Sequence, residues 1–329
     1  MRGYDVGSYQ HFDEVREAPM GVYDAPQWLL SAWSASCREA GATAAPEQVR
    51  AVGQRLIERW SEPGRHFHNI KHLVHVLSRV DELAQETHEP DLVRLAAWYH
   101  GAIFDAAQKA AYANRGGEDE VASAELARTE LAALGIPERR VERVAELVVA
   151  LVRHTATPGD FDCAVLCDAD LAMLAAEPQR YKSYLKDLRA EYAHVPFEDY
   201  LRARAAILTK FQKRSSLFAS PLGAAWEEPA RQNVAAELHR IRKELASLES
   251  AAAVAGVVAE GSGVPGSDGV VNGSPGQPAT DDSSRNGTTV PASATGADAS
   301  TPAAPAAPVT SGPGRGSGAG PRRTGLWFR

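Results

Sequence analysis

Histidines and aspartates recur along this chain at spacings that could build a metal site. His68 and His72 are four residues apart and would share one face of a helix. His100 and His154 each follow an apolar segment, and Asp170 lies in an acidic pair further on. Imidazole and carboxylate are common ligands of divalent first-row metals. A single histidine on an apolar face is more often a core residue, so the prediction of a metal site rests on their joint order.

Helices must position these side chains. Proline opens several segments, glycine follows their ends, and Asn69 is a plausible N-cap for the segment that carries His72. No alternating strand of useful length is present, so we expect an all-α domain of eight to ten helices. The expected helices cover residues 27–40, 46–60, 70–86, 90 to about 104–106, 118–134, 137–155, 164–175, 178–193, 197–219 and 227–249.

The order of these residues resembles the HD-domain superfamily of metal-dependent phosphohydrolases. That family has a histidine on one helix, a His-Asp pair on the next and a distant aspartate. Here the matching positions are His72, His100-Gly101 and Asp170, with Asp168 as the alternative to Asp170. The resemblance implies an HD-like helical bundle in which His72, His100 and Asp170 hold a divalent ion, namely manganese, iron, zinc or magnesium.

The segment from His68 to His72 is also similar to the His-Asn-x-x-His element of cyclic nucleotide phosphodiesterases, in which the first histidine donates a proton. The likeness implies that metal-activated water attacks phosphorus, that His68 protonates the leaving oxygen, and that His154 binds phosphate or a second metal. It is greatest with a bacterial group of predicted HD-superfamily phosphohydrolases and covers about residues 27–245. The strings that carry it are Arg65-His66-Phe67-His68-Asn69, Ala96-Ala97-Trp98-Tyr99-His100, Asp168-Ala169-Asp170-Leu171 and Arg189-Ala190-Glu191-Tyr192.

Gly101 departs from the family pattern, because the His-Asp pair has lost its aspartate. Asp105, one turn further on, could compensate directly or through water. Glu118, Asp119 and Glu120 follow a loop and could also reach the site, but we favour their interpretation as the solvated first turn of a helix, where negative charge is favoured. Glycine within a helix costs about 1 kcal/mol relative to alanine. We therefore expect Gly101→Asp to be tolerated and to tighten metal binding.

Two main functions remain open on these residues. The first is a phosphohydrolase acting on a phosphoester, such as a nucleotide. The second is a catalytically silent module that senses a nucleotide or another small phosphorylated ligand, which the loss at Gly101 favours. The enzyme is favoured by the retention together of His68, His72, His100, His154 and Asp170. A third class is an adaptor that works through its C-terminal segment.

The composition divides the chain into three parts. Residues 1–25 are a polar extension, 26–250 carry the helical patterns, and 251–329 contain one Leu, one Trp and one Phe and no Ile, Met, Tyr or Lys. Such a segment cannot bury enough apolar surface to offset its ordering entropy, so we expect it to be disordered. Its last residues, Leu326-Trp327-Phe328, could form a protein-docking motif.

Charge and hydropathy exclude several classes of function. The formal net charge is -7, without a broad basic region, so nucleic acid is not expected as the main partner. No apolar run approaches the roughly 20 residues that span a bilayer, and the N-terminus does not resemble a signal peptide. Three cysteines, an odd number, suit a reducing compartment better than a disulfide framework. We expect a soluble, cytoplasmic protein.

Overall fold

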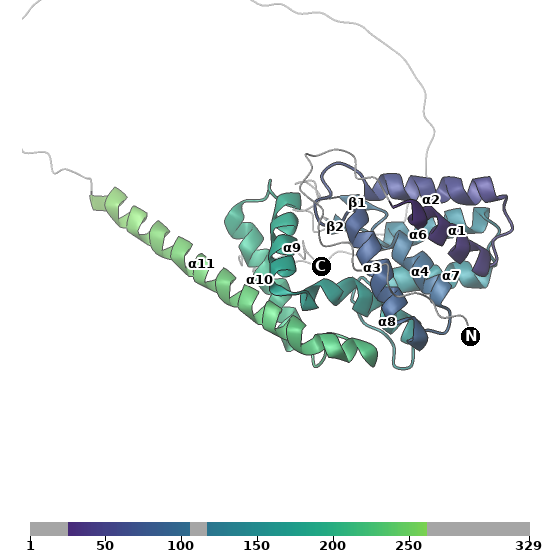
Figure 1. Ribbon diagram of the computed structural model, residues 1–329. Coiled ribbons are helices and arrows are strands. Elements are labelled where there is room, and N and C mark those ends of the chain that lie inside the picture. The colour runs from purple at the N-terminus through teal and green to yellow at the C-terminus, as the bar shows by residue number, and fades with distance from the viewer. Residues whose placement is uncertain (1–25, 106–116, 262–329) are drawn as a thin grey trace, which may run out of the picture. The chain divides into compact units, whose positions relative to one another are not determined.

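A computed structural model describes residues 26–105 and 117–261, with side chains as far as residue 251. Within these residues the chain forms ten α-helices and a single pair of two-residue strands, which confirms the predicted all-α class (Figure 1). The predicted extension 1–25, and the part of the C-terminal segment that contains Leu326-Trp327-Phe328, lie outside the described residues.

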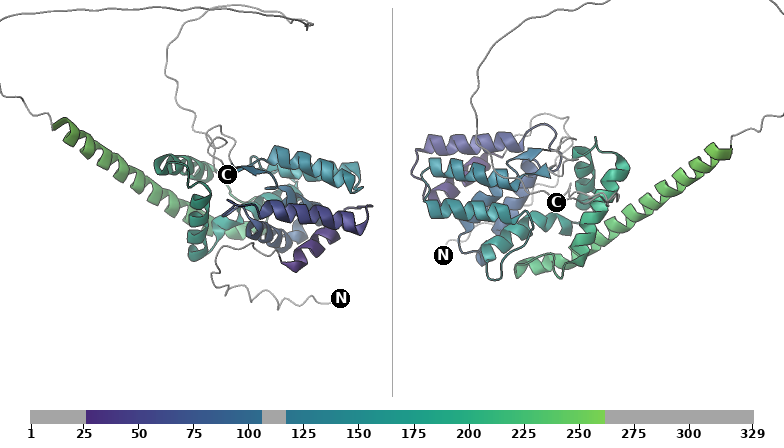
Figure 2. Two further views of the ribbon diagram at one scale, coloured as in Figure 1. Left: turned by 90° about the horizontal axis from the view of Figure 1, so that it is seen from above. Right: turned by 180° about the vertical axis from the view of Figure 1, so that it is seen from behind.

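The first seven of these helices pack around one core. They are α1 (Gln27–Glu39), α2 (Pro46–Trp60), α3 (Ile70–Glu82), α4 (Pro90–Tyr99), α6 (Glu120–Ala133), α7 (Glu138–Ala150) and α8 (Phe161–Leu171). Helix α4 contacts α1, α3, α6, α7 and α8, and Figures 1 and 2 show it among them. Its polar residues Asp91 and Arg94 lie in its first half, and every residue from Leu95 to Tyr99 is buried, as its position requires.

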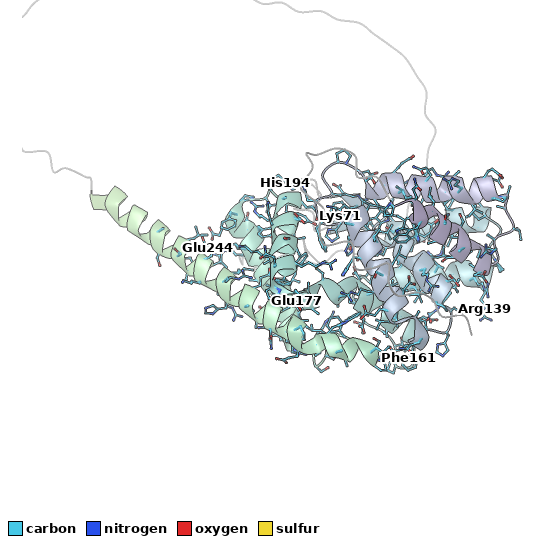
Figure 3. All side chains as sticks on the ribbon, viewed as in Figure 1. Lys71, Arg139, Phe161, Glu177, His194 and Glu244 are labelled. Carbon is cyan, nitrogen blue, oxygen red and sulfur yellow. The ribbon has the colours of Figure 1, made fainter. Side chains whose placement is uncertain are left out.

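The last three helices build a second core. They are α9 (Pro178–Glu191), α10 (Phe197–Lys213) and α11 (Glu227–Gly261), and their apolar side chains include Leu188, Leu208, Val234 and Leu238. Side chains fill the space between the ribbons in Figure 3. The first core ends along the chain at Ala169 and the second begins at Leu171. Asp170 therefore lies where the two cores meet.

Helix α3 begins where the sequence predicts, directly after Asn69. The Asn69 Oδ1 atom accepts a hydrogen bond from the Lys71 amide at 2.9 Å and so caps α3. This contact satisfies one of the free amides of the first turn. It also fixes where α3 starts, and with that the direction in which His72 points.

Several predicted helix boundaries near the metal-site residues are wrong. Helix α7 ends at Ala150 and not near residue 155, so His154 lies beyond it, and α8 begins at Phe161 and not near residue 164. Helix α4 ends at Tyr99, not near residue 105, and the chain continues to strand β1 (Phe104–Asp105). That strand pairs antiparallel with β2 (Gly117–Glu118), with Phe104 opposite Glu118. Glu118 is thus extended, and α6 begins only after Asp119, whose Oδ1 accepts from the Ala122 amide at 2.9 Å. The predicted helix begins two residues too early, at Glu118, and that residue proves important for the site.

The C-terminal end of the last helix also differs from the prediction, because α11 runs to Gly261 and not to residue 249. The alanines that follow residue 250 are good helix formers, so they extend a helix that packing has already started. No helix within residues 26–105 and 117–261 is both long and apolar enough to cross a membrane.

Candidate metal centre

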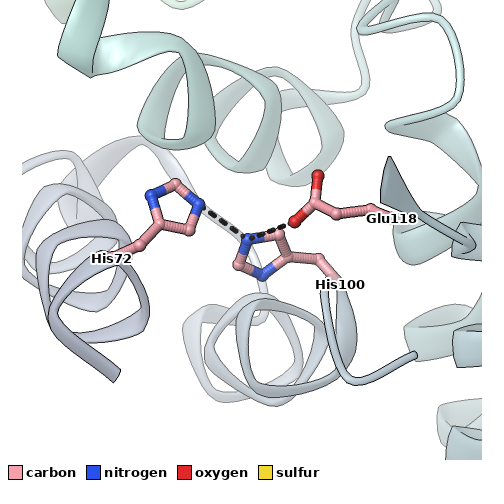
Figure 4. A group of neighbouring side chains, drawn as sticks. All are labelled: His72, His100 and Glu118. Atoms are coloured by element: carbon pink, nitrogen blue, oxygen red, sulfur yellow. Dashed lines mark hydrogen bonds and ion pairs between the residues drawn. The ribbon is translucent and has the colours of Figure 1, made fainter. Parts of the chain in front are cut away.

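His72 and His100 form the centre of the candidate site. His72 lies on α3, and His100 is the residue that caps the C-terminus of α4. Their Nε2 atoms are 3.2 Å apart, and both residues are buried (Figure 4). The predicted pair of ligands is therefore brought together from two helices that pack against each other.

The surroundings of both imidazoles favour the neutral form that binds metals. Burial lowers the pKa of His100 to about 4. Its Nδ1 atom donates to the Ala97 carbonyl at 2.6 Å, which leaves the Nε2 lone pair facing His72. Burial also lowers the pKa of His72, although Asp170 opposes the shift. The Nδ1 atom of His72 is buried and has no hydrogen-bond partner within the described residues.

Asp170, on α8, faces the same two nitrogens. Its Oδ1 atom is 3.2 Å from Nε2 of His72 and 3.6 Å from Nε2 of His100. Its Oδ2 atom accepts from His154 Nε2 at 2.6 Å. Burial alone would raise the pKa of Asp170, but the hydrogen bonds from His154 and His72 hold it well below its usual value. Asp170 is therefore an ionised carboxylate directed at the two histidines.

Glu118 supplies a second carboxylate, which the sequence interpretation had assigned to a solvated helix turn. Its Oε1 atom is 3.7 Å from His100 Nε2, and one ligand atom from each of His72, His100 and Glu118 lies within 4.8 Å of the others (Figure 4). This Oε1 atom is buried and has no hydrogen-bond partner within the described part of the chain. Burial, together with the nearby charge of Asp170, raises the pKa of Glu118 to about 8.

The absence of a side chain at Gly101 makes room for Glu118. A Cβ atom built on Gly101 would lie 2.6 Å from Glu118 Oε1 and would overlap the ring of Trp60. The indole of Trp60 is fixed, because its Nε1 atom donates to the Trp98 carbonyl at 3.0 Å. The expectation that Gly101→Asp would be tolerated is therefore wrong for a rigid backbone, since packed interiors do not absorb such overlaps cheaply.

His68 lies beside the cluster and is held by Glu191. Its Nδ1 atom donates to Glu191 Oε2 at 2.8 Å, while the amides of Phe67 and His68 donate to Oε1 at 2.8 and 2.7 Å. Burial alone would lower the pKa of His68, but the charge and hydrogen bond of Glu191 and the charge of Glu118 raise it to about 9. His68 is therefore protonated at neutral pH, with Nδ1 occupied and Nε2 available.

A pocket connects these groups. The free space inside it is about 30 Å³, and part of the pocket is open to solvent. One end is polar, with His68, His72, Glu118 and Asp170. The rest of the wall is mostly apolar or aromatic, and its residues are Phe67, Leu171, Met173, Leu174, Tyr184, Arg204 and Phe211. Four of the groups described above, His68, His72, Glu118 and Asp170, thus line one cavity that is open to solvent.

The two accessory aspartates of the sequence prediction do not join the cluster. Asp168 points elsewhere, because its Oδ1 and Oδ2 atoms accept from the amides of Ala219 and Ser220 at 2.8 and 2.7 Å. It holds the segment before α11 and is not part of the pocket wall. Asp105 lies in β1 with an exposed side chain. The second carboxylate beside His100 Nε2 is that of Glu118 instead.

His154 lies next to Asp170 rather than at a separate phosphate or second metal position. The backbone of His154 is left-handed, with φ of 45°, and its carbonyl accepts from Arg214 Nη1 at 3.1 Å. This conformation is uncommon for a residue other than glycine, and contacts on both sides maintain it. The geometry favours a role for His154 in holding Asp170.

The donor set fits a divalent ion. It combines two neutral imidazole nitrogens with two carboxylates, a mixture that first-row transition metals accept readily. The buried Glu118 Oε1 atom, which has no hydrogen-bond partner in the described chain, also shows that the cluster is not saturated by protein contacts. His72, His100, Asp170 and Glu118 are therefore the residues that would hold the ion.

Comparison of the chain with protein-family models, with curated proteins and with solved structures gives no match. The functional argument therefore depends on the geometry of the pocket and on the order of the site residues along the sequence.

Proposed function

We propose that this protein is a metal-dependent phosphohydrolase of the HD type that acts on a phosphoester. One observation carries the proposal. Two neutral histidines and two carboxylates that are each about one-tenth exposed converge at the polar end of a pocket, and in this proposal Glu118 takes the place of the aspartate missing at Gly101. The order of His68, His72, His100 and Asp170 along the chain, which resembles that of HD-domain enzymes, gives independent support.

The four ligands have separate roles in holding the ion. His72 and His100 supply Nε2 lone pairs, and Asp170 supplies Oδ1 while His154 fixes its other oxygen. Glu118 adds the negative charge that two neutral imidazoles lack. A bound divalent ion would polarise the phosphate and lower the pKa of a water molecule near it.

His68 is suited to protonate the leaving oxygen. A general acid must be protonated at working pH and must present its proton to the substrate. Glu191 raises the pKa of His68 and holds Nδ1, so that the Nε2 proton is left for the pocket that His68 lines. In this proposal Glu191 is a positioning residue, because it acts on substrate only through His68.

A silent binding module is the alternative, and the raised pKa of Glu118 favours it. With a pKa of about 8, this carboxyl is largely protonated at neutral pH in the metal-free protein. A metal must displace that proton, which weakens its binding. A site that binds metal too weakly to hold it in solution could still bind a phosphorylated ligand.

Turnover of phosphoesters separates the two functions. Purified protein would be assayed against a panel of phosphate monoesters and diesters with added manganese, iron, zinc or magnesium, beside His68→Gln and the exposed-residue control His66→Ala. We expect metal-dependent turnover that His68→Gln reduces by roughly two to four orders of magnitude. His66→Ala should behave as the wild type.

If no metal gives turnover and a phosphorylated ligand still binds saturably, the protein is a sensor and not an enzyme. Turnover that persists unchanged in His68→Gln would retain the hydrolase but remove the proposed proton donor. Melting temperatures of both variants show whether a loss of activity reflects loss of fold.

A further inference from the structure

The carbonyl groups that follow α7 are held by an arginine from the second core. Helix α7 ends at Ala150, so the carbonyls beyond it have no helical amide to accept from. Arg214, the C-terminal cap residue of α10, donates from Nη2 to the Arg153 carbonyl at 2.7 Å and from Nη1 to the His154 carbonyl at 3.1 Å. A cation is favoured at this place, because free carbonyls give the end of a helix a partial negative charge.

These two hydrogen bonds fix the backbone of His154. The peptide group that contains the Arg153 carbonyl lies on one side of the His154 Cα atom, and the group that contains the His154 carbonyl lies on the other side. Because each peptide group is planar, holding both of them sets the two dihedral angles between them. His154 has φ of 45°, a left-handed conformation that residues other than glycine adopt only where their surroundings maintain it. The guanidinium of Arg214 maintains it from another helix.

The backbone of His154 in turn directs its imidazole at Asp170. The His154 Nε2 atom is 2.6 Å from Asp170 Oδ2, while Asp170 Oδ1 faces His72 and His100. A change in the backbone angles of His154 would turn its Cβ atom and move the imidazole away from this carboxylate. The orientation of Asp170 therefore depends on Arg214, although the two side chains are joined only through His154.

Arg214 is itself well placed for this role. Its guanidinium lies 5.4 Å from the centre of the Phe211 ring, which belongs to the pocket wall, and its carbonyl accepts from Arg231 Nη2 at 3.0 Å. Among the residues that the structure describes, the guanidinium bonds to the two carbonyls and pairs with no carboxylate. A planar guanidinium can hold two neighbouring acceptors at once, which a lysine ammonium does less precisely.

We propose that Arg214 is a positioning residue for the candidate metal centre and acts on Asp170 through His154. The inference rests on the metal site of the proposed phosphohydrolase. All four candidate ligands come from α3, the end of α4, β2 and α8, before the helices of the second core begin. Arg214 therefore gives the second core an influence on metal binding without supplying a ligand.

Metal affinity in a double-substitution cycle tests the proposal. Competition with a chelator would measure Mn²⁺ binding by the wild type, Arg214→Ala, His154→Ala and the double variant. We expect Arg214→Ala to weaken Mn²⁺ binding roughly tenfold, and to have no further effect where residue 154 is already alanine. Wild-type affinity in Arg214→Ala, or an equal loss with and without His154, would overturn the proposal.

A conservative variant separates the guanidinium from its charge. Arg214→Lys keeps a cation that can donate to one of the two carbonyls, so its Mn²⁺ affinity should lie between those of the wild type and Arg214→Ala. If Arg214→Ala does not fold, Arg214→Lys replaces it in the same cycle. A smaller loss that again disappears in the His154→Ala background is then expected, and a loss that persists there contradicts the proposal.

Glu227→Ala is the control for general loosening of the second core. Glu227 accepts from the amides of Leu217 and Phe218 at 2.9 and 3.2 Å, just beyond Arg214. Its removal should lower the melting temperature and leave Mn²⁺ affinity unchanged, while the exposed neighbour Lys213→Ala should change neither. If Glu227→Ala weakens Mn²⁺ binding as much as Arg214→Ala does, the effect is one of stability and the positioning role is rejected.

The inference and the proposed function fail separately, because Mn²⁺ binding requires no turnover. Metal binding with the expected cycle but without hydrolysis rejects the hydrolase and retains the role of Arg214. Metal-dependent hydrolysis with wild-type affinity in Arg214→Ala rejects the positioning role alone. A wild-type protein that binds no Mn²⁺ rejects both.

Discussion

The Oε1 atom of Glu118 lies 2.6 Å from the point that a Cβ atom on Gly101 would occupy. A side chain at position 101 and the carboxylate of Glu118 would therefore overlap beside His100. The HD pattern has an aspartate directly after the histidine. This protein has Gly101 at that position, and the carboxylate beside His100 belongs to Glu118 of β2. The relationship explains why a glycine follows His100 and why Glu118 is buried.

Substitution at Gly101 should disturb the site rather than restore it. We expect Gly101→Ala to lower the free energy of unfolding by about 1–3 kcal/mol, because its Cβ overlaps Trp60. Metal affinity should fall as well, since Glu118 is displaced. Gly101→Asp should be at least as harmful. Thermal unfolding and metal titration check both effects. A stable Gly101→Asp protein with tighter metal binding would show that the backbone moves and that Glu118 is not needed.

His154 should support metal binding without being essential for it. His154→Ala removes the 2.6 Å hydrogen bond that holds Asp170 Oδ2. Loss of such a supporting contact typically weakens metal affinity by roughly 10–100-fold. Competition with a chelator measures the change, and exposed His88 provides the control His88→Ala. Complete loss of metal in His154→Ala would instead make His154 a ligand.

The ion pair of His68 with Glu191 should make stability depend on pH. The pKa of His68 rises from 6.5 to about 9 on folding, so its contribution is complete below pH 6.5 and is lost as the pH rises through 9. In metal-free protein with chelator, the difference in unfolding free energy between wild type and His68→Gln should shrink from pH 7 to 10, by on the order of 2–3 kcal/mol. Denaturant titrations measure it.

Glu191→Gln is the companion variant, because it removes the charge that raises the pKa of His68. In protein that carries Glu191→Gln, the additional substitution His68→Gln should leave the unfolding free energy nearly unchanged over the same pH range. A wild-type difference that is constant from pH 7 to 10 would show that His68 is neutral in the folded protein.

The helical class and the cap at Asn69 could be predicted because they depend on local signals. Proline at first-turn positions and apolar periodicity lie within one segment of sequence. The end of α4 and the pairing of Phe104 with Glu118 could not be predicted from the sequence, because two-residue strands have no periodic pattern. Their pairing depends on where the segment between them returns, which is a property of the tertiary fold.

The candidate site also contains residues that the sequence order predicts and residues that only the tertiary fold brings to it. The order along the sequence identified His72, His100 and Asp170, which the structure brings together. It ranked Glu118 as a solvated residue of a helix start rather than as a ligand, because its neighbours are acidic, and it gave no role to Glu191, which stands in one of the strings that carry the family resemblance. The available signal was the missing carboxylate at Gly101, which required a replacement from another segment.

Metal binding by Glu118→Gln tests directly whether Glu118 holds a metal ion together with His72, His100 and Asp170. Elemental analysis and calorimetric titration with Mn²⁺ would compare wild type with Glu118→Gln, with His72→Ala, His100→Ala and Asp170→Ala, and with the control His66→Ala. The account predicts one ion per chain in the wild type and in His66→Ala, strong loss in the three predicted ligand variants, and affinity lowered at least roughly tenfold in Glu118→Gln. Wild-type affinity in Glu118→Gln, or equal occupancy across all variants, would contradict it.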